Sequence, residues 1–139
     1  MNGTNNNPGI ALSGESYNNT FNNNTITVSG NETDNYGIYF LGGFFKPTDN
    51  NFTNTIINTS ATYAARGIYI TNGGTNTNIF NHTTIYTTGN ESYALFILNS
   101  NGTILENTIF NDTNQWINHT GTSETNLTNT TYATPNGSI

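Results

Sequence analysis

The chain has 139 residues, of which 32% are hydrophobic, 12% aromatic and 7% charged, and its formal net charge is −6 at pH 7. Its two basic residues, Lys46 and Arg66, are too few to neutralise a phosphate backbone, so we expect no nucleic-acid partner. No apolar run reaches the roughly 18 residues of a membrane-spanning helix, so we expect no membrane insertion, and the absence of cysteine excludes disulfides and Cys-ligated zinc.

A short phrase of small and apolar residues recurs along the chain after residues 1–8, which are predicted to form an N-terminal arm. In each copy the alternation predicts a strand with its second and fourth residues facing inward and its third facing outward. The copies are Gly9-Ile10-Ala11-Leu12, Gly37-Ile38-Tyr39-Phe40, Gly67-Ile68-Tyr69-Ile70 and Ala94-Leu95-Phe96-Ile97.

A second phrase follows the first in constant order, and its last residue is predicted to face inward. It reads Asn24-Thr25-Ile26, Asn54-Thr55-Ile56, Thr83-Thr84-Ile85, Asn107-Thr108-Ile109 and Asn129-Thr130-Thr131. A further inward residue lies four or five positions before the last residue of each copy: Phe21, Phe52, Phe80, Leu105 and Leu127. Copies recur every 22 to 30 residues or so, which is the spacing of one coil in a solenoid. We therefore predict an all-β fold over residues 9–132, a parallel β-helix of about five coils with two clear strands per coil and room for a third.

Stacking the predicted coils places equivalent residues about 4.8 Å apart along the axis. An asparagine column in such a stack forms an amide ladder, because each side chain donates to one neighbouring coil and accepts from the other. The predicted ladder consists of Asn24, Asn54, Asn107 and Asn129. Clusters such as Ser29-Gly30-Asn31 make the connections, since Gly and Asn tolerate left-handed backbone conformations.

The segment from Gly42 to Asp49 lengthens the second coil and is predicted to protrude as a loop. Residues 133–139 lose the pattern and are predicted to form a C-terminal tail. Neither end carries the helix or charged loop that usually keeps sheet edges from pairing. We therefore expect self-association by end-to-end stacking into a polymer.

The phrases at Gly9 to Leu12 and Asn19 to Ile26 resemble the right-handed parallel β-helix repeats of NosD-like periplasmic copper-processing proteins and of many archaeal surface proteins, within the pectin-lyase-like superfamily. The resemblance covers about residues 9 to 132 and implies the fold. It implies little about function, because such repeats occur in adhesins, lyases and surface-layer proteins alike.

Candidate catalytic groups are sparse. Most carboxylates fall singly in turns, only Glu32 and Glu91 occupy equivalent positions, and Arg66 has no evident carboxylate column around it. The two histidines, His82 and His119, are not spaced as metal ligands. We therefore predict no enzymatic activity, no metal and no cofactor, and a polysaccharide lyase or hydrolase is only the third hypothesis.

Outward aromatic residues are the candidate contact site. Tyr39, Tyr69 and Phe96 share one position in three copies of the first phrase, and Phe44 and Phe45 lie in the predicted loop. These rings are predicted either to contact carbohydrate or a second subunit, or, for the column, merely to stiffen the sheet as an aromatic ladder.

Asn-x-Ser/Thr sequons occur fourteen times, about twice the roughly seven expected from this composition. Repeats can copy sequons without function, but a chain with so few charges also fits a surface solvated by sugars. The predicted glycosylation sites are Asn31, Asn51, Asn58, Asn81, Asn90, Asn101, Asn111, Asn118 and Asn126. The sequence thus predicts an extracellular structural glycoprotein, a module of a cell-surface filament, sheath or surface layer, with an adhesin-like carbohydrate-binding module as the alternative.

Overall fold

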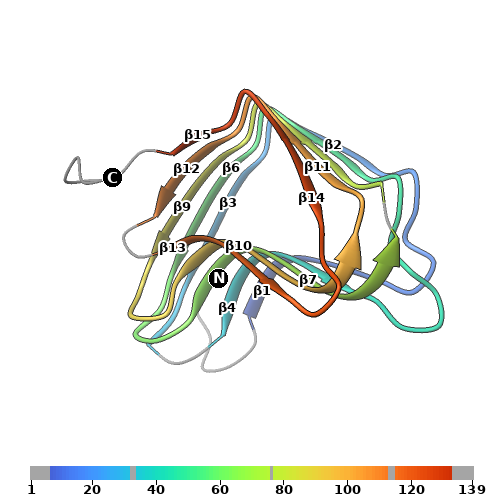
Figure 1. The fold of residues 1–139 in the computed structure, drawn as a ribbon. Coiled ribbons are helices and arrows are strands. Elements are labelled where there is room, and N and C mark those ends of the chain that lie inside the picture. The colour runs from blue at the N-terminus through green and yellow to red at the C-terminus, as the bar shows by residue number, and fades with distance from the viewer. Residues whose placement is uncertain (1–6, 32–33, 76, 113–114, 133–139) are drawn as a thin grey trace.

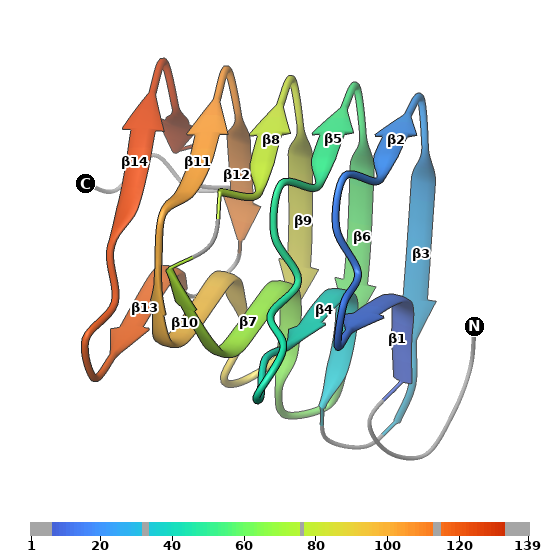
Figure 2. The same cartoon turned by 90° about the vertical axis from the view of Figure 1, so that its right-hand side faces the viewer.

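The computed structural model describes residues 7–31, 34–75, 77–112 and 115–132. Within these ranges there is no helix, and the strands form three parallel sheets of five strands each. Figure 1 looks along the axis and shows one sheet on each side of a roughly triangular cross-section, while Figure 2 shows the coils side by side. The chain is a parallel β-solenoid of about four turns, which confirms the predicted fold class.

Each coil contributes one strand to every sheet, so the third strand for which the sequence left room is present. The first sheet contains, in spatial order, β1 (Asn7–Ser13), β4 (Asn35–Leu41), β7 (Ala65–Thr75), β10 (Tyr93–Asn101) and β13 (Gln115–Thr120). The second contains β2 (Thr20–Asn22), β5 (Asn51–Thr53), β8 (Ile79–Asn81), β11 (Thr103–Glu106) and β14 (Thr125–Thr128). The third contains β3 (Thr25–Ser29), β6 (Ile56–Ser60), β9 (Thr84–Thr88), β12 (Ile109–Asp112) and β15 (Thr131–Tyr132).

One residue in the left-handed conformation makes the tight corner between the second and third sheets in every coil. These corner residues are Asn23, Asn54, His82, Asn107 and Asn129, with φ between 49° and 56°. Asn and His are the side chains that, after Gly, adopt this region most readily. Part of the asparagine content is therefore a backbone requirement of the corners.

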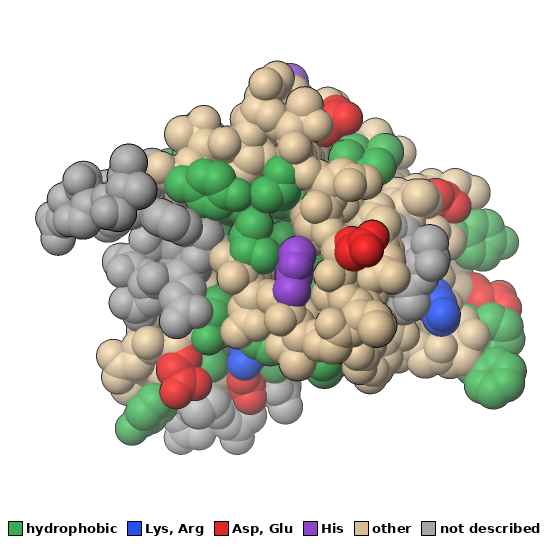
Figure 3. Space-filling model, in the orientation of Figure 1, with side chains coloured by type: hydrophobic (Ala, Val, Ile, Leu, Met, Phe, Trp, Pro, Cys, Tyr) green, Lys and Arg blue, Asp and Glu red, His purple; other side chains and the backbone are tan. Residues whose placement is uncertain are grey.

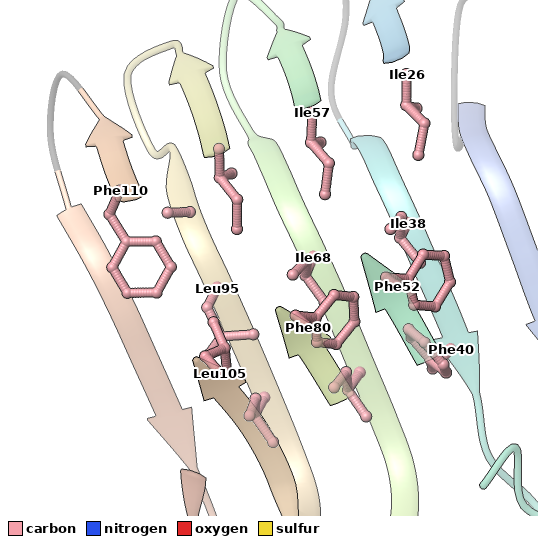
Figure 4. Packing of buried hydrophobic residues seen from close by; sticks show 14 of the residues in the cluster. Ile26, Ile38, Phe40, Phe52, Ile57, Ile68, Phe80, Leu95, Leu105 and Phe110 are labelled. Carbon is pink, nitrogen blue, oxygen red and sulfur yellow. The ribbon is translucent and has the colours of Figure 1, made fainter. Parts of the chain in front are cut away.

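Inward side chains of equivalent strands stack into continuous columns that form the core (Figure 4). Phe52 and Phe80 are fully buried with ring centroids 5.0 Å apart, and Phe40 packs edge-on against both at 6.0 Å. The register aligns Phe21, Phe52, Phe80, Leu105 and Leu127, as predicted. The predicted inward residues Ile38, Phe40, Ile68, Ile70, Leu95 and Ile97 are all buried.

The third sheet shows that three predicted inward positions, Ile56, Ile109 and Thr131, are wrong. Ile56 and Ile109 are 43% and 40% exposed, whereas Ile57 and Phe110 are fully buried. The register pairs Ile57 with Ile26, so the repeated Asn-Thr-Ile triplets are one residue out of phase between coils. Thr131 pairs with Ile109 and likewise points outward, and Tyr132 takes the inward position. Burial of an apolar side chain, and not the identity of the triplet, sets the register, because a slip of one residue reverses every side chain.

The predicted amide ladder is partly correct. Its members Asn54, Asn107 and Asn129 do occupy equivalent corners. In the first coil, however, Asn23 takes the corner, and Asn24 lies one residue further on with its amide nitrogen buried and without a hydrogen-bond partner. Asn129 Nδ2 donates to Asn107 Oδ1 at 3.3 Å.

A second amide ladder, not predicted from the sequence, lies just before the strands of the second sheet. Asn19 Nδ2 donates to Asn50 Oδ1 at 2.8 Å, and Asn50 Nδ2 donates to Asn78 Oδ1 at 2.9 Å. Asn50 Nδ2 also donates to the carbonyl of Ser16, and Asn78 Nδ2 to that of Pro47, both at 3.0 Å. Asn50 and Asn78 are fully buried. Buried amides cost free energy unless they are hydrogen-bonded, so this ladder favours one alignment of the first three coils.

The segment between β4 and β5 protrudes at the lower right of Figure 1, as the sequence predicts. Its tip, Phe44, is fully exposed, and its return limb bridges Thr48 to Tyr17 of the first coil. Strand β1 begins at Asn7, so it includes the last two residues of the predicted N-terminal arm. Residues 1–6 of that arm and the predicted tail, residues 133–139, lie outside the described residues.

Candidate functional site

The outer face of the first sheet presents two columns of side chains because the repeated phrase contains an irregularity. The register pairs Tyr36 with Arg66 and Tyr39 with Tyr69 but skips the glycine between them. A Cβ on Gly37 would lie 2.2 Å from a buried isoleucine of β6, so only glycine fits there. The glycine departs from the regular alternation, so the outward side chains on either side of it lie three positions apart, as Tyr36 and Tyr39 do. Both positions therefore face outward, and each gives rise to one column.

We call these two columns the aromatic patch. The first column contains Tyr36, Arg66 and Tyr93, and the second contains Tyr39, Tyr69 and Phe96.

The rings of the aromatic patch contact one another rather than standing free. Tyr39 and Tyr69 stack with centroids 5.2 Å apart and planes 10° apart, while Phe96 meets Tyr69 edge-on at 5.2 Å. Two nearly parallel rings with centroids this close must overlap face to face. Rings lying side by side in one plane would have centroids further apart. Between Tyr39 and Tyr69 it is therefore ring edges and hydroxyls that point outward, which favours the stiffening role over a flat platform for sugars.

Arg66 lies at the centre of the patch. Its Cζ is 5.5 Å from the ring centre of Tyr36, 5.1 Å from Tyr69 and 4.9 Å from Phe96, all within cation–π range. Its Nη1 donates to Asp34 Oδ1 at 2.6 Å, and the side chain is only 16% exposed. The sequence predicts no carboxylate column around Arg66, and the structure pairs it with the single carboxylate of Asp34. The two residues lie 32 positions apart, and only the coil register brings them together.

Burial tunes the phenols of the patch. It raises the pKa of the Tyr36 hydroxyl well above its usual range, and the nearby Asp34 carboxylate adds to this effect. Burial likewise raises the pKa of Tyr39. Both phenols therefore remain protonated at neutral pH, so they serve as hydrogen-bonding and packing groups and not as bases.

The first column of the patch and Asp34 were not predicted as site residues. The sequence signal that could identify this column is the residue immediately before the glycine or alanine of the repeated phrase. In the four copies this residue is Pro8, Tyr36, Arg66 and Tyr93. In the second copy this residue is Tyr36, which lies two positions before the buried Ile38. Alternation with a period of two therefore assigns it to the inner face. The irregularity at the glycine reverses the assignment.

The loop aromatics differ from the patch because they pack on little. Phe44 is 101% exposed and Phe45 is 58% exposed, and their rings meet edge-on at 6.3 Å. Tyr17, which is 57% exposed, lies on the neighbouring coil at the bridge to Thr48. Ring faces are therefore available here and not on the aromatic patch.

The predicted glycosylation sites fall into two groups. Asn31 and Asn90 lie in exposed bends or turns, Asn58, Asn111 and Asn118 take outward positions on strands, and Asn126 is exposed on β14. In the other three the side-chain oxygen is engaged or buried: Asn51 Oδ1 accepts a hydrogen bond from Thr53, Asn81 Oδ1 accepts one from Asn107, and Asn101 Oδ1 is buried.

Outside the Arg66–Asp34 pair, the titratable side chains His119 and Asp49 contact hydroxyl groups in the part of the chain described. His119 Nε2 lies 2.9 Å from Thr125 Oγ1, and Asp49 accepts a hydrogen bond from Thr77. Among the described residues no group of three or more His, Asp or Glu side chains is placed to hold a metal ion, and no helix suited to cross a membrane occurs. Glu32 lies outside the described residues, so its predicted equivalence to Glu91 stays a prediction.

Comparison with protein-family models, curated proteins and solved structures found no match for this chain. The resemblance to NosD-like and pectin-lyase-like repeats therefore extends to the β-solenoid fold and no further.

Proposed function

We propose that this protein is an extracellular structural glycoprotein, a rigid β-solenoid module of a cell-surface filament, sheath or surface layer. The observation that carries the proposal is that sequon asparagines face outward on all three sides of the solenoid. Asn118 lies on the first sheet, Asn126 on the second, and Asn58 and Asn111 on the third. Glycans on every side would solvate a rod whose own surface has very few charges (Figure 3).

Rigidity follows from the way the coils are joined. The core columns connect each coil to its neighbours along the axis, and the buried ladder of Asn19, Asn50 and Asn78 also joins the first three coils. Pulling on such a stack loads many hydrogen bonds and packed columns together. A load-bearing role therefore suits the fold without any catalytic group.

Electron microscopy of the native material, with glycan mapping of the same sample, tests this function. We expect fibres or sheets with one chain per about 24 Å of axis, which is five rungs of about 4.8 Å. Sugar should occupy the outward sites such as Asn58 and Asn126 in preference to Asn81, whose side chain is hydrogen-bonded. Isolated particles without sugar would overturn the proposal.

The second candidate function, an adhesin-like carbohydrate-binding module, is favoured by the exposure of Phe44 and Phe45. Two adjacent rings on a protruding loop offer faces on which sugars stack. Replacing both with Ala should abolish binding to a glycan array and leave the circular dichroism unchanged, since neither ring is buried. Tyr86→Ala, which removes a 41% exposed ring on the third sheet, is the matched control and should bind normally.

A further inference from the structure

Among the described residues, the sheet strands at both ends of the solenoid are paired on one side only. In each sheet the order begins with a strand of the first coil and ends with a strand of the last, so β1, β2 and β3, and also β13, β14 and β15, have one partner strand each among the described residues. An unpaired edge is a template for another strand.

None of these six terminal strands contains a charged residue. Their sequences are NPGIALS, TFN and TITVS at one end and QWINHT, TNLT and TY at the other. Natural proteins usually protect open edges with inward charges, Lys or bulges. Nothing in the terminal strands therefore opposes pairing by charge.

Apolar side chains are incompletely covered at both ends. On the last coil Leu127 is 39% and Tyr132 43% exposed, whereas their column neighbours Leu105 and Phe110 are fully buried. Figure 3 faces this end and shows apolar side chains among mostly uncharged polar ones, with a histidine and an acidic side chain near the centre. On the first coil, Phe21 is only partly buried and stacks on Phe52 with centroids 4.4 Å apart.

We propose that the last coil of one copy docks on the first coil of a second copy in the register of the internal coils. This rests on the proposed structural function and specifies its interface. Each core column then continues across the junction, with Ile117 on Ile10, Leu127 on Phe21 and Tyr132 on Ile26 of the second copy. The corner ladder continues as well, because Asn129 comes to lie one rung from Asn23, which has the same left-handed backbone.

The internal register fixes which residues face each other across the junction. The outward column of the third sheet runs through Thr25, Ile56, Thr84, Ile109 and Thr131. Thr131 of one copy would therefore lie about 4.8 Å from Thr25 of the next, within the Cα separation that a disulfide spans. Thr27, two residues along the same strand, would lie about 8 Å away by the same geometry, beyond the span of a disulfide.

Disulfide trapping in the full chain tests the register, since the protein has no cysteine of its own. On mild oxidation, T25C/T131C should give a ladder of covalent oligomers on a non-reducing gel. The matched control T27C/T131C should give at least tenfold less. The three positions used, Thr25 and Thr27 of β3 and Thr131 of β15, are exposed threonines, so neither variant disturbs the core.

The outcomes separate this interface from the broader function. Fibres by microscopy with equal trapping of the two variants would overturn the register and leave the structural function intact. Neither fibres nor trapping in either variant would overturn both.

A surface charge gives an independent test of the same interface. Leu127→Lys puts an ammonium group against Phe21 of the second copy and should abolish assembly. Tyr86→Lys adds the same charge at a 41% exposed outward position of the third sheet, away from both ends, and should assemble normally. Equal assembly of the two variants, with both folded by circular dichroism, would overturn the proposed contact.

Discussion

The central coils and the last coil use the same columns but differ in burial. Phe80 and Leu105 are fully buried, whereas Leu127, which continues their column, is 39% exposed. Likewise Phe110 is fully buried, and Tyr132 below it is 43% exposed. Each rung of a solenoid is covered by two neighbours, and an end rung by one. The difference predicts that equal substitutions have unequal effects along the axis, and that an added coil would restore burial at the end.

The largest difference is expected in the phenylalanine column. Phe80→Ala removes a fully buried ring that stacks on Phe52 and meets Phe40 edge-on, and should cost about 3–5 kcal/mol of unfolding free energy. Leu127→Ala, at the exposed end of the column, should cost about 1 kcal/mol or less, because little area is lost from the core. Urea denaturation of the two variants measures this ratio, and equal losses would contradict the account of burial given above.

The amides should show a similar contrast. Asn50→Ala removes the hydrogen bonds that a fully buried side chain makes with Asn19 Nδ2, Asn78 Oδ1 and the Ser16 carbonyl. Backbone N–H groups still donate to Asn78 Oδ1 and to the Ser16 carbonyl, so a loss of about 2–3 kcal/mol is expected. Asn129→Gly keeps the left-handed corner and removes one exposed hydrogen bond, so a loss of about 0.5 kcal/mol is expected. Thermal unfolding distinguishes the two. A loss below about 1 kcal/mol for Asn50→Ala would show that water replaces the buried ladder.

Arg66 extends the comparison to the outer surface of the central coils. Arg66→Ala removes a guanidinium packed on three rings and paired with Asp34, and should cost about 1–2 kcal/mol. Lys46→Ala makes the same change in net charge on an exposed loop and should stay within about 0.5 kcal/mol of the parent. If both variants lose the same stability, net charge and not packing is responsible.

Much of the fold could be predicted from the sequence because two patterns recur in every coil. The repeat spacing predicts the coils, and the alternation of apolar residues predicts which side chains face inward. The inward residues of the first phrase and the phenylalanine column were correctly predicted on this basis. The phase of the third sheet was not, since Ile56 and Ile57 are adjacent and only burial distinguishes them. The contact of Arg66 with Asp34 depends on the pairing of coils of unequal length, and no local pattern specifies it.

The smallest expected effect on stability comes from His119. Its imidazole occupies the last position of the inward column that contains Ile97 in the preceding coil. Burial lowers the pKa of His119 below its usual value of 6.5. At pH values between 6.5 and the lowered pKa, the unfolded chain binds a proton at His119 more readily than the folded chain does. Protonation therefore leaves the folding free energy unchanged above pH 6.5 and destabilises the fold as the pH falls below 6.5. The ring is largely exposed, so a fall in Tm of only about 1–2 °C is expected between pH 7.5 and 5.5.

His119→Gln should remove this part of the pH dependence, whereas His82→Asn, at a corner on the outer edge of the solenoid, should retain it. Calorimetry of the three proteins at both pH values gives the comparison, and a pH dependence unchanged in His119→Gln would exclude the imidazole as its source. In the assembled protein the pH dependence of stability should be larger. The proposed junction places His119 next to Leu12 of the next copy and buries the imidazole further from water. Fibres that are sensitive to acid in the parent and insensitive in His119→Gln would link the end of this column to the interface.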